Sequence, residues 1–193
     1  MTQLTLPGFE VLPLSLAHHL FFAVMPDADT AARIAGMARR LQSDLRVKAR
    51  PLHAGRLHIS LHHLGDFAHA PEVVVARACV AAASIDARPF GVTFDRISTF
   101  NGGAGNRPLV LTGSAGLDTL IAFQQELGDA LGGAGLRVSR RRFTPHLTLL
   151  YGEARFDSRT IEPIAWTVRE FVLIHSWQGK TRYDIKGRWP LGD

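Results

Sequence analysis

Apolar positions along the chain follow two patterns, one typical of strands and one typical of helices. Residues 20–25 are continuously apolar and stop at Pro26, as expected for a strand that is buried on both faces. Residues 30–44 instead repeat apolar side chains at three- and four-residue spacing, which predicts an amphipathic helix. By the same criteria, further strands are expected at residues 56–64, 90–100, 109–111, 143–151, 166–177 and 183–189, and further helices at residues 71–85 and 117–131.

The expected elements fall into two halves of similar order, separated by the glycine-rich segment 101–106. This order favours an α+β fold that is bilobal, with two antiparallel sheets related by a pseudo-twofold axis, outer helices and a central cleft. We expect residues 1–17 to form an N-terminal tail and residues 18–193 a single bilobal domain. Its two sequence halves would be residues 18–100 and 107–193.

The most informative pattern is a tetrapeptide that occurs twice, as His58–Leu61 (His-Ile-Ser-Leu) and as His146–Leu149 (His-Leu-Thr-Leu). Both copies lie in apolar segments with the composition of strands. Side chains alternate between the two faces of a strand, so the histidine and the hydroxyl residue of each copy share one face. The two apolar side chains of each copy point the opposite way, toward a core.

This pairing suits acid–base chemistry on a phosphodiester. Imidazole titrates near neutral pH, so one of His58 and His146 can accept a proton while the other donates one. The hydroxyls of Ser60 and Thr148 can donate hydrogen bonds to the non-bridging phosphate oxygens, where negative charge gathers in the transition state. The alternative is that both motifs are ordinary sheet residues, but two copies in matching contexts favour the catalytic interpretation. The spacing alone leaves open which histidine is the acid.

With these motifs the chain resembles the two-histidine phosphoesterases, and within them the RNA 2′,3′-cyclic phosphodiesterases formerly called 2′-5′ RNA ligases. The resemblance extends from about residue 20 to residue 191. It rests on Leu-Phe-Phe-Ala-Val-Met-Pro at 20–26, Leu-His-Ile-Ser-Leu-His-His-Leu-Gly at 57–65, Thr-Pro-His-Leu-Thr-Leu at 144–149, and Tyr183 with Trp-Pro-Leu at 189–191.

The resemblance implies hydrolysis of a 2′,3′-cyclic phosphate at an RNA or nucleotide end to a 2′-phosphate. It implies that His58 is the proton donor toward the 3′ oxygen and that His146 is the proton acceptor toward water. It also implies that Ser60 and Thr148 hold the phosphate, that no cofactor is needed, and that 2′-5′ RNA ligation is the reverse of the same chemistry.

Three positions depart from the pattern of the family that the chain resembles. Ser60 replaces the usual threonine and keeps the hydroxyl, whereas His63 replaces an apolar aromatic residue. In a regular strand His63 would face away from His58, and His62 would share the face of His58. Tyr151 stands where many relatives have an arginine, so a phosphate-binding cation is missing there.

Tyr151 itself and Arg142 are the candidate substrate-binding residues outside the two motifs. Arg141 and Arg107 are further candidates to replace the missing cation, and the sequence does not choose among the three arginines.

Charge and composition add modest constraints. The net charge of +5 and the isoelectric point of about 10.1 favour encounter with polyanions such as RNA. The single cysteine, Cys79, excludes an internal disulfide and a cysteine-based zinc site. The histidines at 58, 62 and 63 have no acidic residue at a familiar ligand spacing, so no metal site is expected.

No apolar segment approaches the roughly 20 residues of a membrane span, and the first residues lack the basic start of a signal peptide. We therefore expect a cytoplasmic monomer with no membrane partner. Two other functions remain open: a phosphodiesterase acting on another cyclic phosphate or on a 2′-5′ oligonucleotide, and a non-catalytic RNA-binding module of the same fold.

Overall fold

The computed structural model describes residues 18–44, 48–101, 107–139, 141–153, 155–177 and 183–192, so the expected tail at 1–17 lies outside the described residues. The elements along the chain are β1 (His18–Val24), α1 (Ala28–Asp44), the 3₁₀ helix η1 (Ala54–Arg56), β2 (Ile59–Phe67), α2 (Glu72–Ala83), β3 (Phe90–Thr99), β4 (Arg107–Thr112), α3 (Asp118–Gly133), β5 (Leu147–Gly152), β6 (Arg159–Val168), β7 (Glu170–Trp177) and β8 (Tyr183–Pro190).

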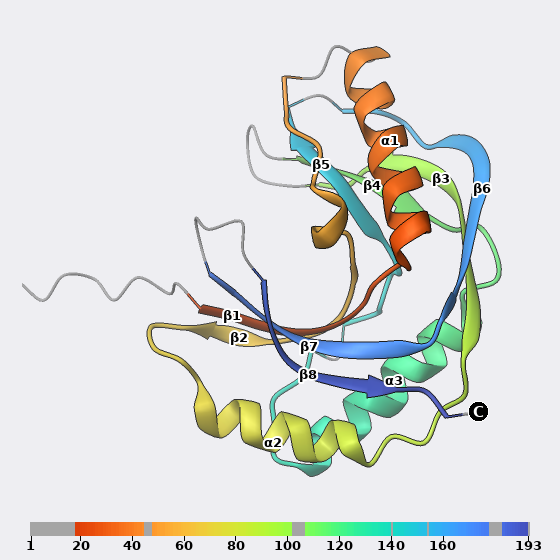
Figure 1. Ribbon diagram of the computed structural model, residues 1–193. Coiled ribbons are helices and arrows are strands. Elements are labelled where there is room, and N and C mark those ends of the chain that lie inside the picture. Colours follow the sequence, from red (N-terminus) through yellow and green to blue (C-terminus); the bar gives the residue numbers. More distant parts are fainter. Residues whose placement is uncertain are drawn as a thin grey trace, which may run out of the picture.

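The strands form two antiparallel sheets of four strands each, in the orders β2-β1-β7-β8 and β5-β4-β3-β6. In Figure 1 the first sheet lies above α2 and α3, and the second sheet lies beside α1. The expected bilobal α+β fold with outer helices is therefore confirmed. Each motif strand, β2 and β5, is the edge strand of its sheet.

The lobes do not coincide with the two sequence halves, which corrects the expectation drawn from the order of elements. Each half does contain a strand, a helix and a motif strand: β1, α1 and β2 in the first half, and β4, α3 and β5 in the second. However, β3 joins the second sheet, while β7 and β8 return to the first.

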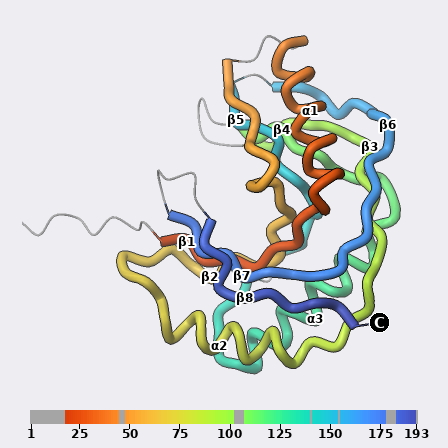
Figure 2. The backbone as a smooth tube through the Cα atoms, viewed as in Figure 1, coloured from red at the N-terminus to blue at the C-terminus, as the bar shows by residue number. Residues whose placement is uncertain are grey.

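The helices are exchanged as well. Helix α1 packs against β5 and β6 of the second sheet, and α3 contacts β2 of the first sheet as well as β3 of the second. The path of the chain from one lobe to the other and back can be followed in Figure 2.

The single strand expected at residues 166–177 is also wrong. The chain there forms two strands in different sheets, β6 and β7, which meet at Arg169. Burial alternates along β6, with Ile164, Trp166 and Val168 buried, because one face of that strand is open to solvent. From Phe171 to Ser176 every residue is buried, because both faces of β7 are packed: Phe171 and Leu173 belong to the main core, and Val172 and Ile174 belong to a second apolar cluster. The apolar residues of the two strands form one continuous pattern in the sequence. The division into β6 and β7 is visible only from the different strands with which each one pairs.

Both motif strands contain an irregularity one residue after the hydroxyl residue of the motif. In β2, Ser60 pairs with Ala23 and His62 pairs with Phe22, so Leu61 is an extra residue. In β5 the same irregularity makes Leu149 the extra residue, because Thr148 pairs with Val110 and Leu150 with Leu109.

These bulges give the two strands the same order of burial. The first, third and fourth residues of each strand are buried, the second is partly exposed and the fifth is exposed. The fifth residues are His63 and Tyr151. The bulge returns each of them to the face of the preceding hydroxyl, so the expectation that His63 faces away from His58 is wrong.

His62, rather than His63, faces the core. Its Nε2 lies 2.7 Å from the carbonyl oxygen of Gln124 in α3, and its side chain is buried. None of the helices in the described part of the chain is long and apolar enough to cross a membrane.

Candidate active site

The two motif histidines are held by the same local interaction. The Nδ1–H of His58 donates to the carbonyl oxygen of Arg56 at 2.8 Å, and the Nδ1–H of His146 donates to the carbonyl oxygen of Thr144 at 2.8 Å. A carbonyl oxygen only accepts, so Nδ1 must carry hydrogen in both rings. In each case Nε2 is left as the nitrogen that can accept or deliver a proton.

The chain before β2 links the two motif strands. The backbone N–H of Leu52 donates to the carbonyl oxygen of Leu149 at 2.7 Å, and Pro51 forms a bridge with Leu150. Strands β2 and β5 also contact each other directly. His58 and His146 are consequently close enough for the charge of His146 to lower the pKa of His58.

The surroundings of His58 favour its neutral form in the free protein. Burial is the largest cause that lowers the pKa of His58, and the charges of Arg56 and His146 act in the same direction. The hydrogen bond to the Arg56 carbonyl opposes this shift without cancelling it. The imidazole packs against the rings of Phe21 and Tyr183, with centroid distances of 5.1 Å and 5.6 Å.

The hydroxyl residues of the motifs occupy the positions expected from strand alternation. Ser60 and Thr148 are partly exposed. The apolar residues on either side of them are buried and belong to the core: Ile59, Leu61, Leu147 and Leu149. The structure thus brings the two motifs together where the strands β2 and β5 meet. The ring of Phe100 lies next to His146, with a centroid distance of 5.0 Å.

Arg56 is a candidate functional residue that the sequence reasoning missed. Its guanidinium carbon lies 4.7 Å from the ring centroid of Tyr183, and its Nη2 donates to the Tyr183 hydroxyl at 3.4 Å. Its Nε is buried and has no hydrogen-bond partner among the described residues. A guanidinium that keeps an unsatisfied donor beside His58 is well suited to an anionic ligand.

The sequence feature that could have identified Arg56 is its position two residues before His58. Tyr183 was part of the resemblance but was given no role. Burial is the main cause that raises the pKa of Tyr183, and the neighbouring Tyr151 adds to the rise. Tyr151, which is exposed on β5, therefore lies near Tyr183 of the other sheet.

The three arginines that were considered as replacement cations lie in other surroundings. The Nη1 of Arg107 donates to the carbonyl oxygen of Glu153 at 2.9 Å. Arg141 and Arg142 line a cavity of about 820 Å³ together with His62 of β2 and residues of α3. The described residues that line this cavity do not include His58, Ser60, His146 or Thr148.

Comparison with known proteins agrees with this geometry. The sequence model of the 2′-5′ RNA ligase superfamily matches residues 26–180. The chain belongs to this superfamily, whose members are two-histidine phosphoesterases. No curated protein sequence matches the chain.

Several solved structures resemble the chain over nearly its whole length. Escherichia coli LigT in its apo form is 27% identical with a TM-score of 0.72, and the match covers 92% of this chain and 99% of LigT. LigT has also been solved with 3′-AMP, at 26% identity, a TM-score of 0.68 and the same coverage. TT0787 of Thermus thermophilus, at 20% identity and a TM-score of 0.71, covers 90% of this chain and 97% of its own, and shares the fold. Membership of the 2′-5′ RNA ligase superfamily and the fold together support a function of the RNA ligase or phosphoesterase type.

Proposed function

We propose that this protein is a metal-independent phosphodiesterase that hydrolyses the 2′,3′-cyclic phosphate at an RNA or nucleotide end to a 2′-phosphate. The observation that carries the proposal is the matched pair of histidines. Each is fixed through Nδ1 by the carbonyl oxygen two residues earlier, and each has Nε2 available for proton transfer. The 3′-AMP and ATP complexes of E. coli LigT support a nucleotide as the ligand.

In the proposed reaction, Nε2 of His146 takes a proton from water as the water oxygen attacks phosphorus. The bond from phosphorus to the 3′ oxygen breaks, and Nε2 of His58 delivers its proton to that oxygen. The products are a 2′-phosphate and a free 3′ hydroxyl. The hydroxyls of Ser60 and Thr148 donate hydrogen bonds to the non-bridging oxygens as negative charge builds on them.

The acid role requires His58 to be protonated, whereas its surroundings lower its pKa in the free protein. A bound phosphate supplies the compensation, because a negative charge beside the imidazole raises the pKa of His58 again. The substrate thereby helps to place the proton that its own leaving group needs. Protein without substrate keeps His58 neutral near pH 7.

We assign Arg56 as the phosphate-binding cation in place of the arginine that is absent at Tyr151. Arg56 carries a buried Nε–H without a partner and is next to the acid histidine. Tyr183 holds the guanidinium by its ring face and its hydroxyl. Tyr151, exposed and near Tyr183, provides an aromatic surface on which a nucleobase can stack.

The test is hydrolysis of a nucleoside 2′,3′-cyclic phosphate in the presence of a chelator, with chromatographic identification of the product. The wild-type protein is expected to release the 2′-phosphate, and His58→Ala and His146→Ala each to lose at least about 100-fold in kcat. His69→Ala, which changes an exposed histidine outside the motifs, is the matched control and is expected to keep wild-type activity.

A phosphodiester with a nitrophenol leaving group separates the two roles. Nitrophenolate leaves without being protonated, so His58→Ala is expected to recover much of its activity on this substrate while His146→Ala stays inactive. Substantial hydrolysis of the cyclic nucleotide by either alanine variant, or loss of wild-type activity on chelation, would contradict the mechanism. Release of a 3′-phosphate would contradict the assigned leaving oxygen.

A further inference from the structure

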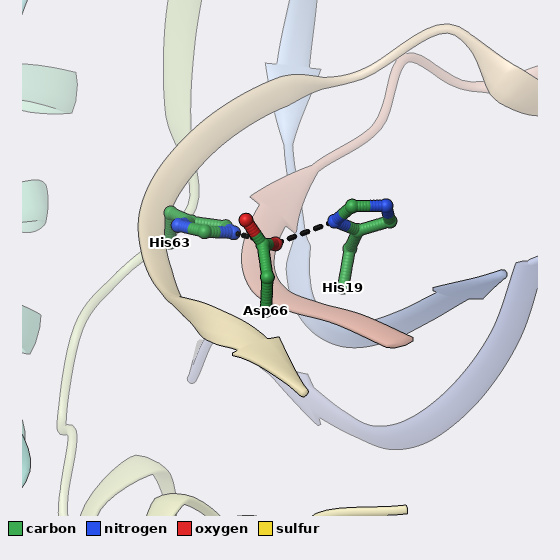
Figure 3. Close-up of side chains that lie close together, drawn as sticks. All are labelled: His19, His63 and Asp66. Atoms are coloured by element: carbon green, nitrogen blue, oxygen red, sulfur yellow. Dashed lines mark hydrogen bonds and ion pairs between the residues drawn. The ribbon is translucent and has the colours of Figure 1, made fainter. Parts of the chain in front are cut away.

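A second cluster of histidines lies near the outer end of the β1–β2 pair. The Nδ1 of His19 and the Nε2 of His63 lie 2.5 Å and 2.8 Å from the same carboxylate oxygen, Oδ1 of Asp66. Figure 3 shows the two imidazoles approaching this carboxylate from opposite sides, His19 from β1 and His63 from β2. One potential ligand atom from each residue lies within 4.8 Å of the other two.

The backbone is shaped to bring these side chains together. His63 and Asp66 are three residues apart, a spacing that puts side chains on opposite faces of a regular strand. In β2 a second irregularity makes Leu64 an extra residue, because Phe21 pairs with His63 and Leu20 with Gly65. The φ of 141° at Gly65 is one that residues with a Cβ rarely adopt, and it allows this step. His63 and Asp66 consequently share a face, and Asp66 pairs directly with His19 across the strands.

We propose that His19, His63 and Asp66 form a binding site for a divalent transition-metal ion of the zinc class. Two imidazoles and one carboxylate suit Zn²⁺, Co²⁺ or Ni²⁺, whereas Mg²⁺ and Ca²⁺ prefer oxygen ligands alone. Bonds of about 2.0–2.2 Å put neighbouring ligand atoms of a tetrahedral zinc ion about 3.3 Å apart. Each imidazole would need to withdraw from Asp66 by roughly 1 Å, and the two imidazole nitrogens, which lie within 4.8 Å of each other, would need to move to the same tetrahedral spacing. The partial exposure of all three side chains permits these shifts.

The site opens on the same face of the sheet as the proposed active site. On β1, His19, Phe21 and Ala23 alternate onto one face, and Ala23 pairs with Ser60 of the motif. The ring of Phe21 contacts His58, so Phe21 lies between the metal site and the motif. Strand β1 has no extra residue, and along it His19 is four residues, or roughly 13 Å at 3.3 Å per residue, from Ala23, the partner of Ser60. At that separation the metal is too far away to touch the reacting phosphate. The remaining coordination positions face solvent, where water or an anionic oxygen can fill them.

The experiment uses the full chain without a histidine tag, stripped of metal and titrated with Zn²⁺ by calorimetry and with Co²⁺ by visible absorption. His63→Gln and Asp66→Asn each remove one ligand with little change of shape. They are expected to weaken binding at least 10- to 100-fold, the usual loss for groups that only support ligands. The matched control is His69→Ala, and the double variant His58→Ala/His146→Ala removes the other histidine pair. Both are expected to bind zinc like the wild type.

Three results would overturn the proposal: no zinc binding by the wild type, binding retained in both cluster variants, or binding lost in the double variant. Circular dichroism without metal checks that each variant is folded, and His63 and Asp66 are exposed enough for both changes to be tolerated. The proposal is independent of the proposed function, because zinc binding is measured directly. Cyclic phosphate hydrolysis is expected to be unchanged in His63→Gln with chelator present.

Discussion

Replacing Arg56 by glutamine removes the cation that we assign to phosphate binding while leaving the backbone of the site in place. The carbonyl oxygen of Arg56 still accepts the Nδ1–H of His58, so the imidazole keeps its orientation. What is lost is a guanidinium that lies on the ring of Tyr183 and has a buried, unpaired Nε–H. The variant therefore tests the charge and its donors separately from the histidine.

The size of the effect follows from the kind of contact. A hydrogen bond to a charged group contributes about 1.5–3 kcal/mol, which corresponds to a loss of about 10- to 150-fold in kcat/KM for the cyclic phosphate. Removing the positive charge also raises the pKa of His58, because that charge is one of the causes that lower it. NMR titration of the imidazole is expected to show this increase in the free protein.

The controls compare arginines in different surroundings. Arg107→Gln changes a side chain bound to the carbonyl oxygen of Glu153, and Arg33→Gln changes an exposed residue of α1. Both are expected to remain within about twofold of wild-type kcat/KM. The assignment would be refuted if Arg56→Gln were equally active while Arg142→Gln lost tenfold or more. An unchanged pKa of His58 in Arg56→Gln would refute the electrostatic part of the reasoning.

Two further predictions concern the elements that support the site. A Cβ added at Gly128 would lie 2.9 Å from Cε1 of the buried His62 ring, so Gly128→Ala is expected to destabilise the protein by about 1 kcal/mol. Gly132→Ala, with open space around the new Cβ, is expected to be neutral or slightly stabilising, and equal urea midpoints for the two variants would contradict this reasoning. Asp27→Ala is expected to cost about 1 kcal/mol, because the Asp27 carboxylate caps α1 through the N–H and hydroxyl of Thr30. These hydrogen bonds lower the pKa of Asp27 in the folded protein. The stability difference between wild type and Asp27→Ala is therefore fully present above the unfolded pKa near 4, and it disappears as the pH falls through the lower folded pKa. Urea unfolding of both proteins at pH 7 and at pH 2 measures this difference.

Local pattern was sufficient to predict most elements and the first half of each motif strand. Helices α1, α2 and α3 and strands β1, β3 and β8 lie close to their expected ranges, because periodicity and capping residues act over a few positions. The division at Arg169 between β6 and β7 was not predictable in this way. It depends on which strands each segment pairs with, and those partners are distant in sequence.

The same limit applied within the site. Strand alternation correctly put Ser60 and Thr148 opposite the buried residues beside them. It failed beyond the bulge, where His62 is buried and His63 is exposed, because a bulge depends on the pairing of two strands and is not visible in the periodicity of one of them. The cluster of His19 with Asp66 was missed for the same reason. His19 and Asp66 are 47 positions apart in the sequence, and only the pairing of β1 with β2 brings them together.

The matched bulges also explain where this chain departs from the two-histidine pattern. Each bulge turns the fifth residue after its histidine toward the face of the motif, so His63 in β2 and Tyr151 in β5 occupy equivalent positions in the two lobes. The two lobes have kept the same histidine and hydroxyl geometry but differ at this one position. In one lobe the residue is a tyrosine near Tyr183, beside the arginine that we assign to phosphate binding. In the other it is a histidine that meets Asp66 and His19. Because this position lies on the same face as the motif in both lobes, a change there alters the exposed surface that adjoins the motif without disturbing the groups proposed to transfer protons.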